Sequence, residues 1–206
     1  MLKKILSLLS GNPRKKYVTV VSGLPRSGTS MMMNMLEKGG IIPLTDLQRT
    51  ADDDNPKGYY EYERAKKLPD GDHEWLQGAQ GKAVKVISAL LPHLPPAYQF
   101  RILFMERAVE EVLASQKKML LRRGEDPHKV SDEELSAMYS KHLRHIESWI
   151  QEHHNHVSCL KVNYNQLLSN PKSIVQEIDS YLGGGLDVAA MSAVIDPKLY
   201  RNRKTA

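Results

Sequence analysis

The sequence predicts a single α/β domain, with a parallel β-sheet flanked by helices. Short apolar runs of strand length recur along the chain, and each is followed by a helical pattern or by a loop that leads to one. No internal repeat or low-complexity tract interrupts this alternation, and 206 residues suit one well-buried domain. We place the domain at residues 17–196, after a lead-in at 1–16 and before a basic tail at 197–206.

The expected strands are apolar on both faces, as in a sheet covered by helices on both sides. Four runs fit this description: Tyr17–Ser22, Ala83–Ser88, Arg101–Met105 and Val157–Val162. The dipeptide Ile41–Ile42 is a candidate for a short fifth strand. Between them, residues 52–72 are polar and rich in Pro and Gly, so we expect a long loop with some local order there.

The expected helices carry apolar residues at helical spacing. The first has an apolar stripe of Met31, Met32, Met35 and Leu36. The second packs inward through Val109, Val112, Leu113, Gln116 and Leu120. The third begins at Ser131 with a capping box to Glu134, and its inward face is Leu135, Met138, Tyr139, His142, Ile146, Trp149 and Ile150. The fourth begins near Asn170-Pro171 and ends at Gly183–Gly185.

Composition narrows the classes of partner and compartment. The net charge of +5 suits an anionic ligand, but the basic residues are too dispersed to predict nucleic acid as a partner. Cys159 is the only cysteine, so we expect no intrachain disulfide, no cysteine-based metal cluster, and a reducing, cytoplasmic location. Residues 1–10 are apolar in part, but no run is long enough to predict a membrane-spanning segment.

The segment from Val18 to Ser30 carries most of the functional information. A buried strand leads into a glycine-bounded loop and then into a helix, which is the arrangement that gathers backbone N–H groups around an anion. The spacing from Gly23 to Gly28 matches the phosphate loop G-x-x-x-x-G-K-[ST], except that Thr29 stands in the place of the lysine. Arg26 supplies a cation three residues earlier. A tight strand-to-helix turn without a ligand is the alternative interpretation.

The missing lysine bears on the kind of anion. In nucleotide-hydrolysing loops the lysine reaches the terminal phosphates, and a carboxylate after another strand helps to hold magnesium. Among the expected strand ends, only Glu106 offers such a carboxylate. The loop therefore favours an anion that requires no metal.

Two motifs together resemble the sulfotransferase family. The run Gly-Leu-Pro-Arg-Ser-Gly-Thr-Ser, from 23 to 30, resembles the arginine-bearing form of its 5′-phosphosulfate-binding loop. Its second signature, an arginine at a strand end and a serine eight residues later, is matched by Arg107 and Ser115. Residues 55–63 and 162–171 are similar to further segments of the family, so the resemblance covers about residues 18–182. It implies a P-loop-NTPase-like sheet with 3′-phosphoadenosine 5′-phosphosulfate (PAPS) across the strand ends.

The resemblance also implies roles for individual residues. The residues that would bind PAPS are Gly23, Pro25, Arg26, Ser27, Gly28, Thr29, Ser30, Arg107, Ser115 and Tyr164. Arg26 would also act in catalysis, since it would face the charge that develops on the leaving phosphate. Many cytosolic members have a catalytic histidine where this chain has Ile87, so the base must differ. Glu61 is the leading candidate, with Glu63 and His93 as alternatives; no metal is expected.

We therefore expect a sulfotransferase that moves a sulfuryl group from PAPS to a hydroxyl or amine of a small-molecule or glycan acceptor. An atypical P-loop small-molecule kinase, or a nucleotide-binding protein without catalysis, remains an alternative. The walls of the acceptor pocket are expected from residues 46–91, which contain no recognisable substrate motif. Nothing in the sequence indicates the oligomeric state.

Overall fold

The computed structural model of the chain describes residues 13–46 and 58–195. The strands are β1 (Val18–Gly23), β2 (Pro43–Leu44), β3 (Ala83–Lys85), β4 (Phe100–Glu106) and β5 (Val157–Asn163). The α-helices are α2 (Thr29–Lys38), α3 (Glu63–Lys66), α4 (Val109–Arg122), α5 (Asp132–Glu152), α6 (Tyr164–Ser169), α7 (Pro171–Tyr181) and α8 (Val188–Ala193). Four 3₁₀ segments are η1 (Pro13–Lys16), η2 (Leu68–Asp70), η3 (Glu74–Ala79) and η4 (Ser88–His93).

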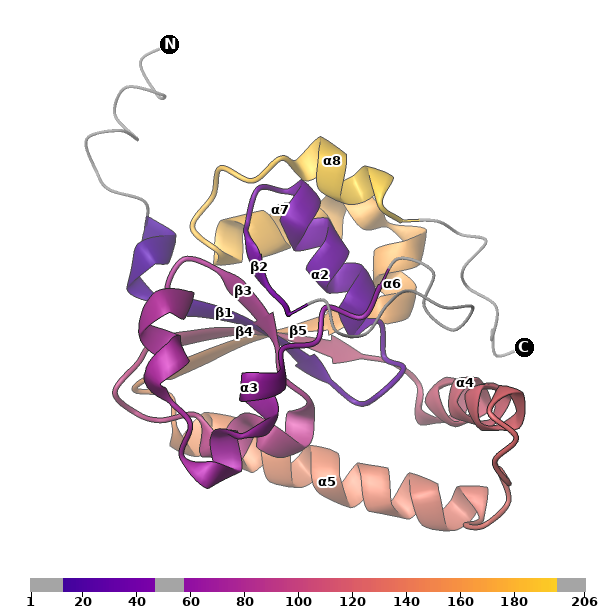
Figure 1. Ribbon diagram of the computed structural model, residues 1–206. Coiled ribbons are helices and arrows are strands. Elements are labelled where there is room, and N and C mark those ends of the chain that lie inside the picture. The colour runs from indigo at the N-terminus through magenta and orange to yellow at the C-terminus, as the bar shows by residue number, and fades with distance from the viewer. Residues whose placement is uncertain (1–12, 47–57, 196–206) are drawn as a thin grey trace.

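The five strands form one parallel sheet in the order β2-β3-β1-β4-β5 (Figure 1). The central strand β1 pairs with β3 through Thr19 and Ala83, and with β4 along its whole length. Because every strand points the same way, all their carboxyl ends meet at one edge, where ligands of such sheets bind. The expected single α/β domain with a helix-flanked parallel sheet is confirmed.

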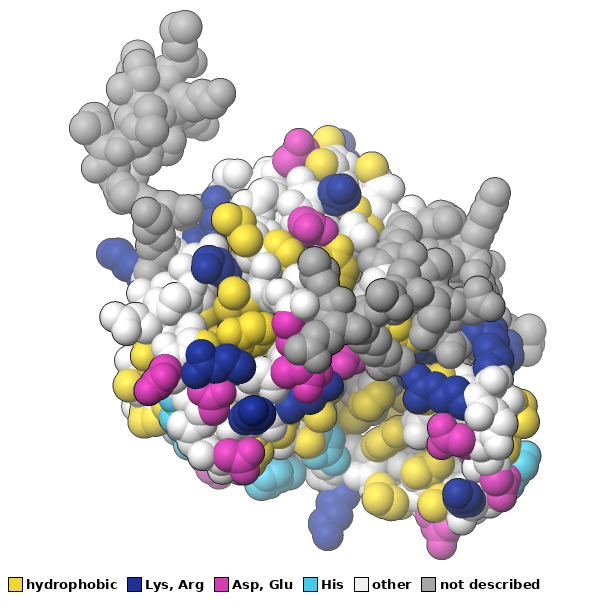
Figure 2. All heavy atoms as spheres, viewed as in Figure 1, with side chains coloured by type: hydrophobic (Ala, Val, Ile, Leu, Met, Phe, Trp, Pro, Cys, Tyr) yellow, Lys and Arg dark blue, Asp and Glu magenta, His cyan; other side chains and the backbone are white. Residues whose placement is uncertain are grey.

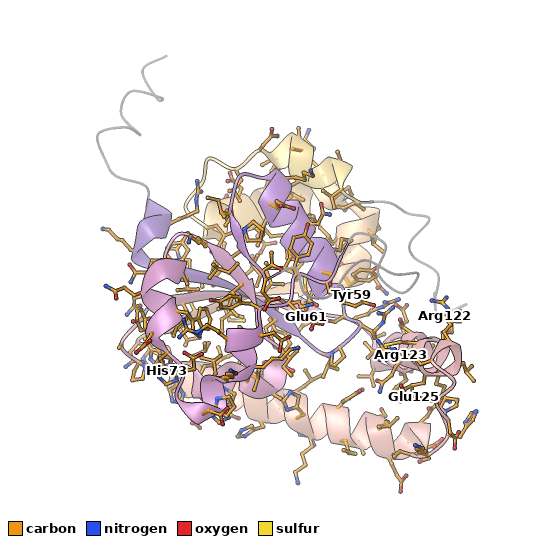
Figure 3. The ribbon with its side chains drawn as sticks, viewed as in Figure 1. Tyr59, Glu61, His73, Arg122, Arg123 and Glu125 are labelled. Carbon is orange, nitrogen blue, oxygen red and sulfur yellow. The ribbon has the colours of Figure 1, made fainter. Side chains whose placement is uncertain are left out.

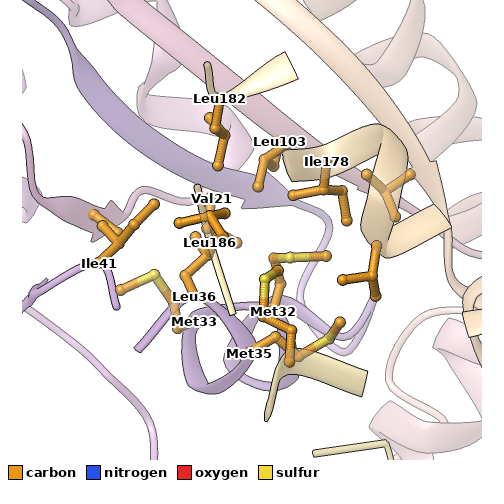
Figure 4. Packing of buried hydrophobic residues seen from close by; sticks show 14 of the residues in the cluster. Val21, Met32, Met33, Met35, Leu36, Ile41, Leu103, Ile178, Leu182 and Leu186 are labelled. Atoms are coloured by element: carbon orange, nitrogen blue, oxygen red, sulfur yellow. The ribbon is translucent and has the colours of Figure 1, made fainter. Parts of the chain in front are cut away.

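Helices cover both faces of the sheet, and each face has its own hydrophobic core. Figure 1 shows α2, α7 and α8 on one side and α5 on the other. On the first side, Met32, Met35 and Leu36 of α2 pack with Leu103 and Ile178 (Figure 4). On the second side, Ile146 and Trp149 of α5 pack with residues of β1, β4 and the 3₁₀ segments. The apolar runs of the strands are explained by this double cover.

Several local predictions are confirmed. The Ser131–Glu134 capping box opens α5, and α7 begins at Pro171 and ends before the glycines at 183–185. Within 58–72, α3 and η2 supply the expected local order. Residues 52–57, most of the expected lead-in and the basic tail at 197–206 lie outside the described residues, and the domain boundaries stay a prediction.

Three details of the prediction are wrong. The short strand is Pro43–Leu44 rather than Ile41–Ile42, because the Ile41 amide bonds to the Leu36 carbonyl at the end of α2. Strand β3 ends at Lys85, since η4 begins at Ser88. Met138 is 61% exposed, because the first half of α5 extends beyond the sheet beside α4 (Figure 1). In the described part of the chain, no helix is long and apolar enough to cross a membrane.

Candidate anion-binding site

The loop between β1 and α2 has a backbone shape that depends on its two glycines. Gly23 has φ 145°, and a Cβ there would lie 2.6 Å from Ser27 Oγ and 2.7 Å from the Met105 carbonyl oxygen. Gly28 has φ 102°, and a Cβ there would lie 2.5 Å from the Tyr164 ring. Any side chain would therefore displace neighbours as well as strain the backbone. The sequence signal in these glycines reflects close packing around the loop.

Arg26 lies in the loop with a left-handed backbone, φ 70°, which is uncommon for a residue with a side chain. Two contacts hold it there. Its Nε donates a hydrogen bond to Ser115 Oγ of α4 at 3.0 Å, and its carbonyl oxygen accepts one from Arg107 Nη1 at 3.1 Å. The two arginines that the sequence singles out are thus directly joined, and Ser115 belongs to the same group. This strained conformation is one that a functional site would retain.

Arg107 is the centre of a buried polar cluster. Its side chain is only 7% exposed, and its Nε donates to Glu111 Oε2, in the first turn of α4, at 2.9 Å. Its guanidinium lies 4.5 Å from the centroid of the Tyr164 ring, within the range of a cation–π contact. Asn165 Nδ2 donates to the other Glu111 oxygen at 3.2 Å. The guanidinium plane is therefore fixed from several sides before any ligand binds.

Glu111 and Asn165 are functional candidates that sequence reasoning missed. Glu111 is 3% exposed, and a carboxylate so deeply buried is found almost only beside a partner such as Arg107. A signal was available, because Glu111 comes only four residues after Arg107, within reach of an ion pair across the start of α4. Tyr164 was predicted, and its burial raises the pKa of its phenol, which stays neutral.

The remaining loop residues occupy different environments. Pro25 is exposed, and Ser27 is buried with its amide bonded to the Leu24 carbonyl. Thr29 and Ser30 form the first turn of α2 and are partly buried. Gly28, at the N-cap, cannot contribute a side-chain cap, so the first N–H groups of α2 face the loop without one.

The segment before α3 lies against the start of α2 and the end of β3. The Tyr59 carbonyl accepts hydrogen bonds from Ser30 Oγ, at 3.4 Å, and from Lys85 Nζ. Glu61 follows two residues later (Figure 3), and its carboxylate accepts a hydrogen bond from Lys66 Nζ at 3.0 Å. Thr45 Oγ1 donates to the Glu61 carbonyl oxygen at 3.0 Å. These contacts tie the Glu61 backbone to the edge of the sheet that carries the loop.

The three candidate bases differ in exposure. The Glu61 side chain is 20% exposed, whereas that of Glu63 is 42% exposed and binds the same Lys66 Nζ at 2.6 Å. His93 is exposed at the end of η4. Across residues 13–46 and 58–195, no group of three or more His, Cys, Asp or Glu side chains is placed to hold a metal ion.

Comparison with known proteins adds information on the fold. No family model matches this chain, and no curated protein matches it in sequence. The sulfotransferase domain from the Synechococcus PCC 7002 olefin synthase is similar in structure, with 16% identity and a TM-score of 0.50 over 94% of this chain and 86% of that one. The sulfotransferase from Alicyclobacillus acidocaldarius aligns over 90% of this chain and 98% of its own, with 14% identity and a TM-score of 0.42. The first likeness shows that the chain has the fold of that sulfotransferase domain.

Proposed function

We propose that this protein is a PAPS-dependent sulfotransferase. The observation that carries the proposal is the link between Arg26 in the loop after β1 and Arg107 at the end of β4. PAPS has anionic groups at both the 5′ and the 3′ position of one ribose, so it needs two cationic sites side by side. Arginine suits both, since its planar guanidinium binds phosphate oxygens in pairs. The shared fold with a sulfotransferase domain supports the same function.

In this proposal the loop N–H groups and Arg26 bind the 5′-phosphosulfate. Arg107 and Ser115 bind the 3′-phosphate, and Tyr164 lies beside them. The residues fit such a ligand, because Gly23–Ser30 supplies one guanidinium, three hydroxyls and no carboxylate. A kinase-type loop would instead use a lysine and a magnesium ion, so we propose that no metal is required.

The reaction breaks the bond between sulfur and the bridging phosphate oxygen and forms a bond between sulfur and the acceptor oxygen or nitrogen. Negative charge grows on the bridging oxygen, where Arg26 and the loop N–H groups stabilise it. The acceptor loses a proton, which we assign to the Glu61 carboxylate. Glu61 is preferred over Glu63 and His93, because it lies two residues from a carbonyl that contacts Ser30 of α2 and is less exposed than either.

Thermal unfolding with nucleotides tests the proposal. Adenosine 3′,5′-bisphosphate at about 100 times its Kd should stabilise the protein by about 2.7 kcal/mol. Chelation of divalent cations should leave this stabilisation unchanged, and ATP with magnesium should give little. The opposite pattern would favour the kinase alternative. Stabilisation by the bisphosphate without any turnover of PAPS would favour a nucleotide-binding protein without catalysis.

The acceptor as a small molecule or glycan, the absence of nucleic acid among the partners, and the cytoplasmic location remain predictions from the sequence. Cys159 is unpaired, and burial raises the pKa of its thiol to about 12. A thiol with so high a pKa is a poor nucleophile, so we assign it no part in the reaction.

A further inference from the structure

We propose that Tyr60 is a positioning residue, which fixes the direction of the Glu61 carboxylate through a hydrogen bond to Glu37. This role rests on the proposed function, since it matters for the reaction only if Glu61 accepts the proton of the acceptor. Tyr60 acts through its neighbour and need contact neither substrate. Helix α2 then begins at the phosphosulfate loop and, near its end, carries the residue that holds the segment of the base.

The backbone of Tyr60 has a strained, left-handed conformation, with φ 52°. Among the described residues other than glycine, only Arg26 shares a positive φ. A tyrosine in this conformation is uncommon and costs free energy, so the contacts around it must hold it there. Because a left-handed residue turns the chain, the direction in which the Glu61 side chain leaves the segment depends on the torsion angles of Tyr60. Backbone strain thus occurs at one proposed catalytic residue and directly before the other.

The backbone on either side of Tyr60 is held by hydrogen bonds. Before it, the Tyr59 carbonyl accepts a hydrogen bond from Ser30 Oγ, in the first turn of α2, at 3.4 Å. After it, the Glu61 carbonyl accepts one from the Asp46 amide at 3.2 Å. In Figure 3, Tyr59 and Glu61 lie close together beside the lower end of α2, where the helix begins. With both neighbours held, the conformation of Tyr60 determines how the chain passes from one to the other.

The Tyr60 side chain is held by the other end of α2. Its hydroxyl donates a hydrogen bond to Glu37 Oε2 at 2.6 Å, and Glu37 lies in the last turn of the helix. From Ser30 to Glu37 an α-helix rises by about 10 Å, so the Tyr60 side chain lies along α2. Its ring also packs against the hydrophobic core on this side of the sheet. The base segment is therefore attached to both ends of the helix that follows the loop.

The contact between Tyr60 and Glu37 is a charge-assisted hydrogen bond, a class that is stronger than a hydrogen bond between neutral groups. Burial, together with the hydrogen bond to Glu37 and its charge, raises the pKa of the Tyr60 phenol well above its usual value, so the hydroxyl remains a donor. Glu37 is exposed, so water could solvate its carboxylate without a protein partner. The hydrogen bond therefore serves to hold Tyr60 and is not required to neutralise a buried charge.

The ion pair of Glu61 cannot fix the carboxylate by itself. Lys66 Nζ lies 3.0 Å from a Glu61 oxygen and 2.6 Å from a Glu63 oxygen, so the two carboxylates share one cation. Figure 2 shows acidic and basic side chains side by side over α3, at the surface. The Lys66 side chain is 51% exposed, and ion pairs with such exposed groups contribute little to fixing a geometry. The direction of Glu61 must therefore come from its backbone, which Tyr60 controls.

Hydrogen exchange of the full chain without nucleotide tests whether the contact holds the segment. The amides to follow are those of Asp46 and Glu63, which donate to the Glu61 carbonyl and to Asp46 Oδ2. Tyr60→Phe and Glu37→Ala should each speed their exchange by about fivefold or more, because the segment then opens more often. Glu37→Gln keeps an oxygen that accepts the hydrogen bond, so its exchange should be close to that of wild type.

Turnover then tests whether Tyr60 acts through Glu61, with PAPS as the donor and water as the acceptor. Tyr60→Phe should lower kcat by roughly tenfold and leave the KM for PAPS within about twofold, since the base is misplaced and the donor site is not. In a Glu61→Gln background the same change should lower kcat by less than about twofold, because the group that Tyr60 positions is already missing. Tyr98→Phe, just before β4 at the opposite edge of the sheet, and the exposed Glu177→Ala are matched controls that should resemble wild type in both measurements.

Unchanged amide exchange in both Tyr60→Phe and Glu37→Ala would overturn the role of Tyr60, whatever the turnover. An equal loss of kcat from Tyr60→Phe with and without the Glu61 carboxylate would overturn it as well, because Tyr60 would then act on the fold in general. Faster exchange in variants of a protein that neither turns over PAPS nor is stabilised by adenosine 3′,5′-bisphosphate would refute the proposed function. It would still show that Glu37 and Tyr60 hold the segment.

Discussion

Arg26 reaches across 89 residues of sequence to Ser115, with its Nε 3.0 Å from the serine Oγ. In the proposed function these two residues serve opposite ends of one nucleotide, Arg26 the 5′-phosphosulfate and Ser115 the 3′-phosphate. Their direct contact means that both ends are served by a single connected group of side chains.

The second cation site should discriminate between nucleotides that differ only in the 3′-phosphate. Arg107→Lys keeps the charge but loses the Nε bond to Glu111 and the stacked guanidinium plane. Calorimetry should show affinity for adenosine 3′,5′-bisphosphate lowered by roughly 10–100-fold, since a hydrogen bond to a charged group contributes about 1.5–3 kcal/mol. Affinity for adenosine 5′-monophosphate should change much less, and Arg123→Lys, an exposed control, should change neither. An equal loss for both nucleotides would contradict this assignment.

The buried carboxylate of Glu111 should matter for stability. In Glu111→Ala the Arg107 guanidinium loses its buried partner, which typically costs about 3–5 kcal/mol. Glu111→Gln keeps an oxygen that can accept a hydrogen bond, so this variant should lose less stability. Urea unfolding measures both, and the exposed Glu125→Ala should stay within about 0.5 kcal/mol of wild type. If Glu111→Ala and Glu111→Gln both have a free energy of unfolding close to that of wild type, the prediction is wrong.

Gly28 should tolerate no side chain. Gly28→Ala places a methyl group 2.5 Å from the Tyr164 ring as well as at φ 102°. Gly124 is the matched control, because its φ is 70° but nothing lies within 4 Å of a Cβ there. Gly124→Ala should cost about 1 kcal/mol for the backbone alone. Gly28→Ala should cost about 2 kcal/mol more by urea unfolding, since the ring must move; similar losses at both positions would refute the packing argument.

Glu61 should affect turnover without affecting binding of the donor. Glu61→Gln removes the proton acceptor, and loss of a general base usually lowers the rate by roughly 10²–10⁴-fold. The rate is followed as release of adenosine 3′,5′-bisphosphate from PAPS, with water as the acceptor. Glu63→Gln, which likewise replaces a carboxylate that contacts Lys66, is the control and should retain most of the activity. If Glu63→Gln is the slower variant, the base is Glu63.

His142 should make stability sensitive to pH. Its ring nitrogen Nε2 lies 2.8 Å from Ser88 Oγ, and burial lowers its pKa in the folded protein, with a further contribution from His145. The unfolded chain therefore takes up the proton at higher pH, near the ordinary value of about 6.5. The stability that results from this difference in pKa is fully present above the ordinary value. It is lost as the pH falls towards the lower pKa of the folded state. Urea unfolding between pH 7.5 and 5.5 should show a smaller loss for His142→Asn than for wild type; an unchanged loss would contradict it.

Features that depend on neighbouring residues could be predicted from the sequence. The capping box depends only on Ser131 and Glu134. A buried strand such as β1 can be predicted because its residues are apolar in an uninterrupted run. The exposure of Met138 could not be predicted, because it depends on how far α5 extends beyond the sheet. The start of the short strand at Pro43 could not be predicted either, because the Ile41 amide donates its hydrogen bond to the Leu36 carbonyl at the end of α2.

The candidate site likewise has features that the sequence predicts and features that depend on tertiary packing. Motif spacing identified Arg26, Arg107 and Ser115 one by one, but not the hydrogen bonds that join the loop after β1 to the end of β4 and to α4. Glu111 was missed because a glutamate on a helix is usually solvated, and only the burial of Arg107 makes it a partner. No motif predicts the cavity lined by Leu24, Phe104 and Ile146, since its walls come from segments that meet only in the folded chain.

The contact between Gly28 and Tyr164 has a consequence for when the loop can fold during synthesis on the ribosome. The loop is among the first described segments to be synthesised, yet its strand needs β4 as a neighbour and its second glycine packs under a ring 136 residues later. Contacts of such long sequence separation form late in folding. A nascent chain that ends before Tyr164 would thus carry every residue of the loop without its binding shape. In the proposed function, the loop would therefore be able to bind its anion only after β5 and α6 have emerged.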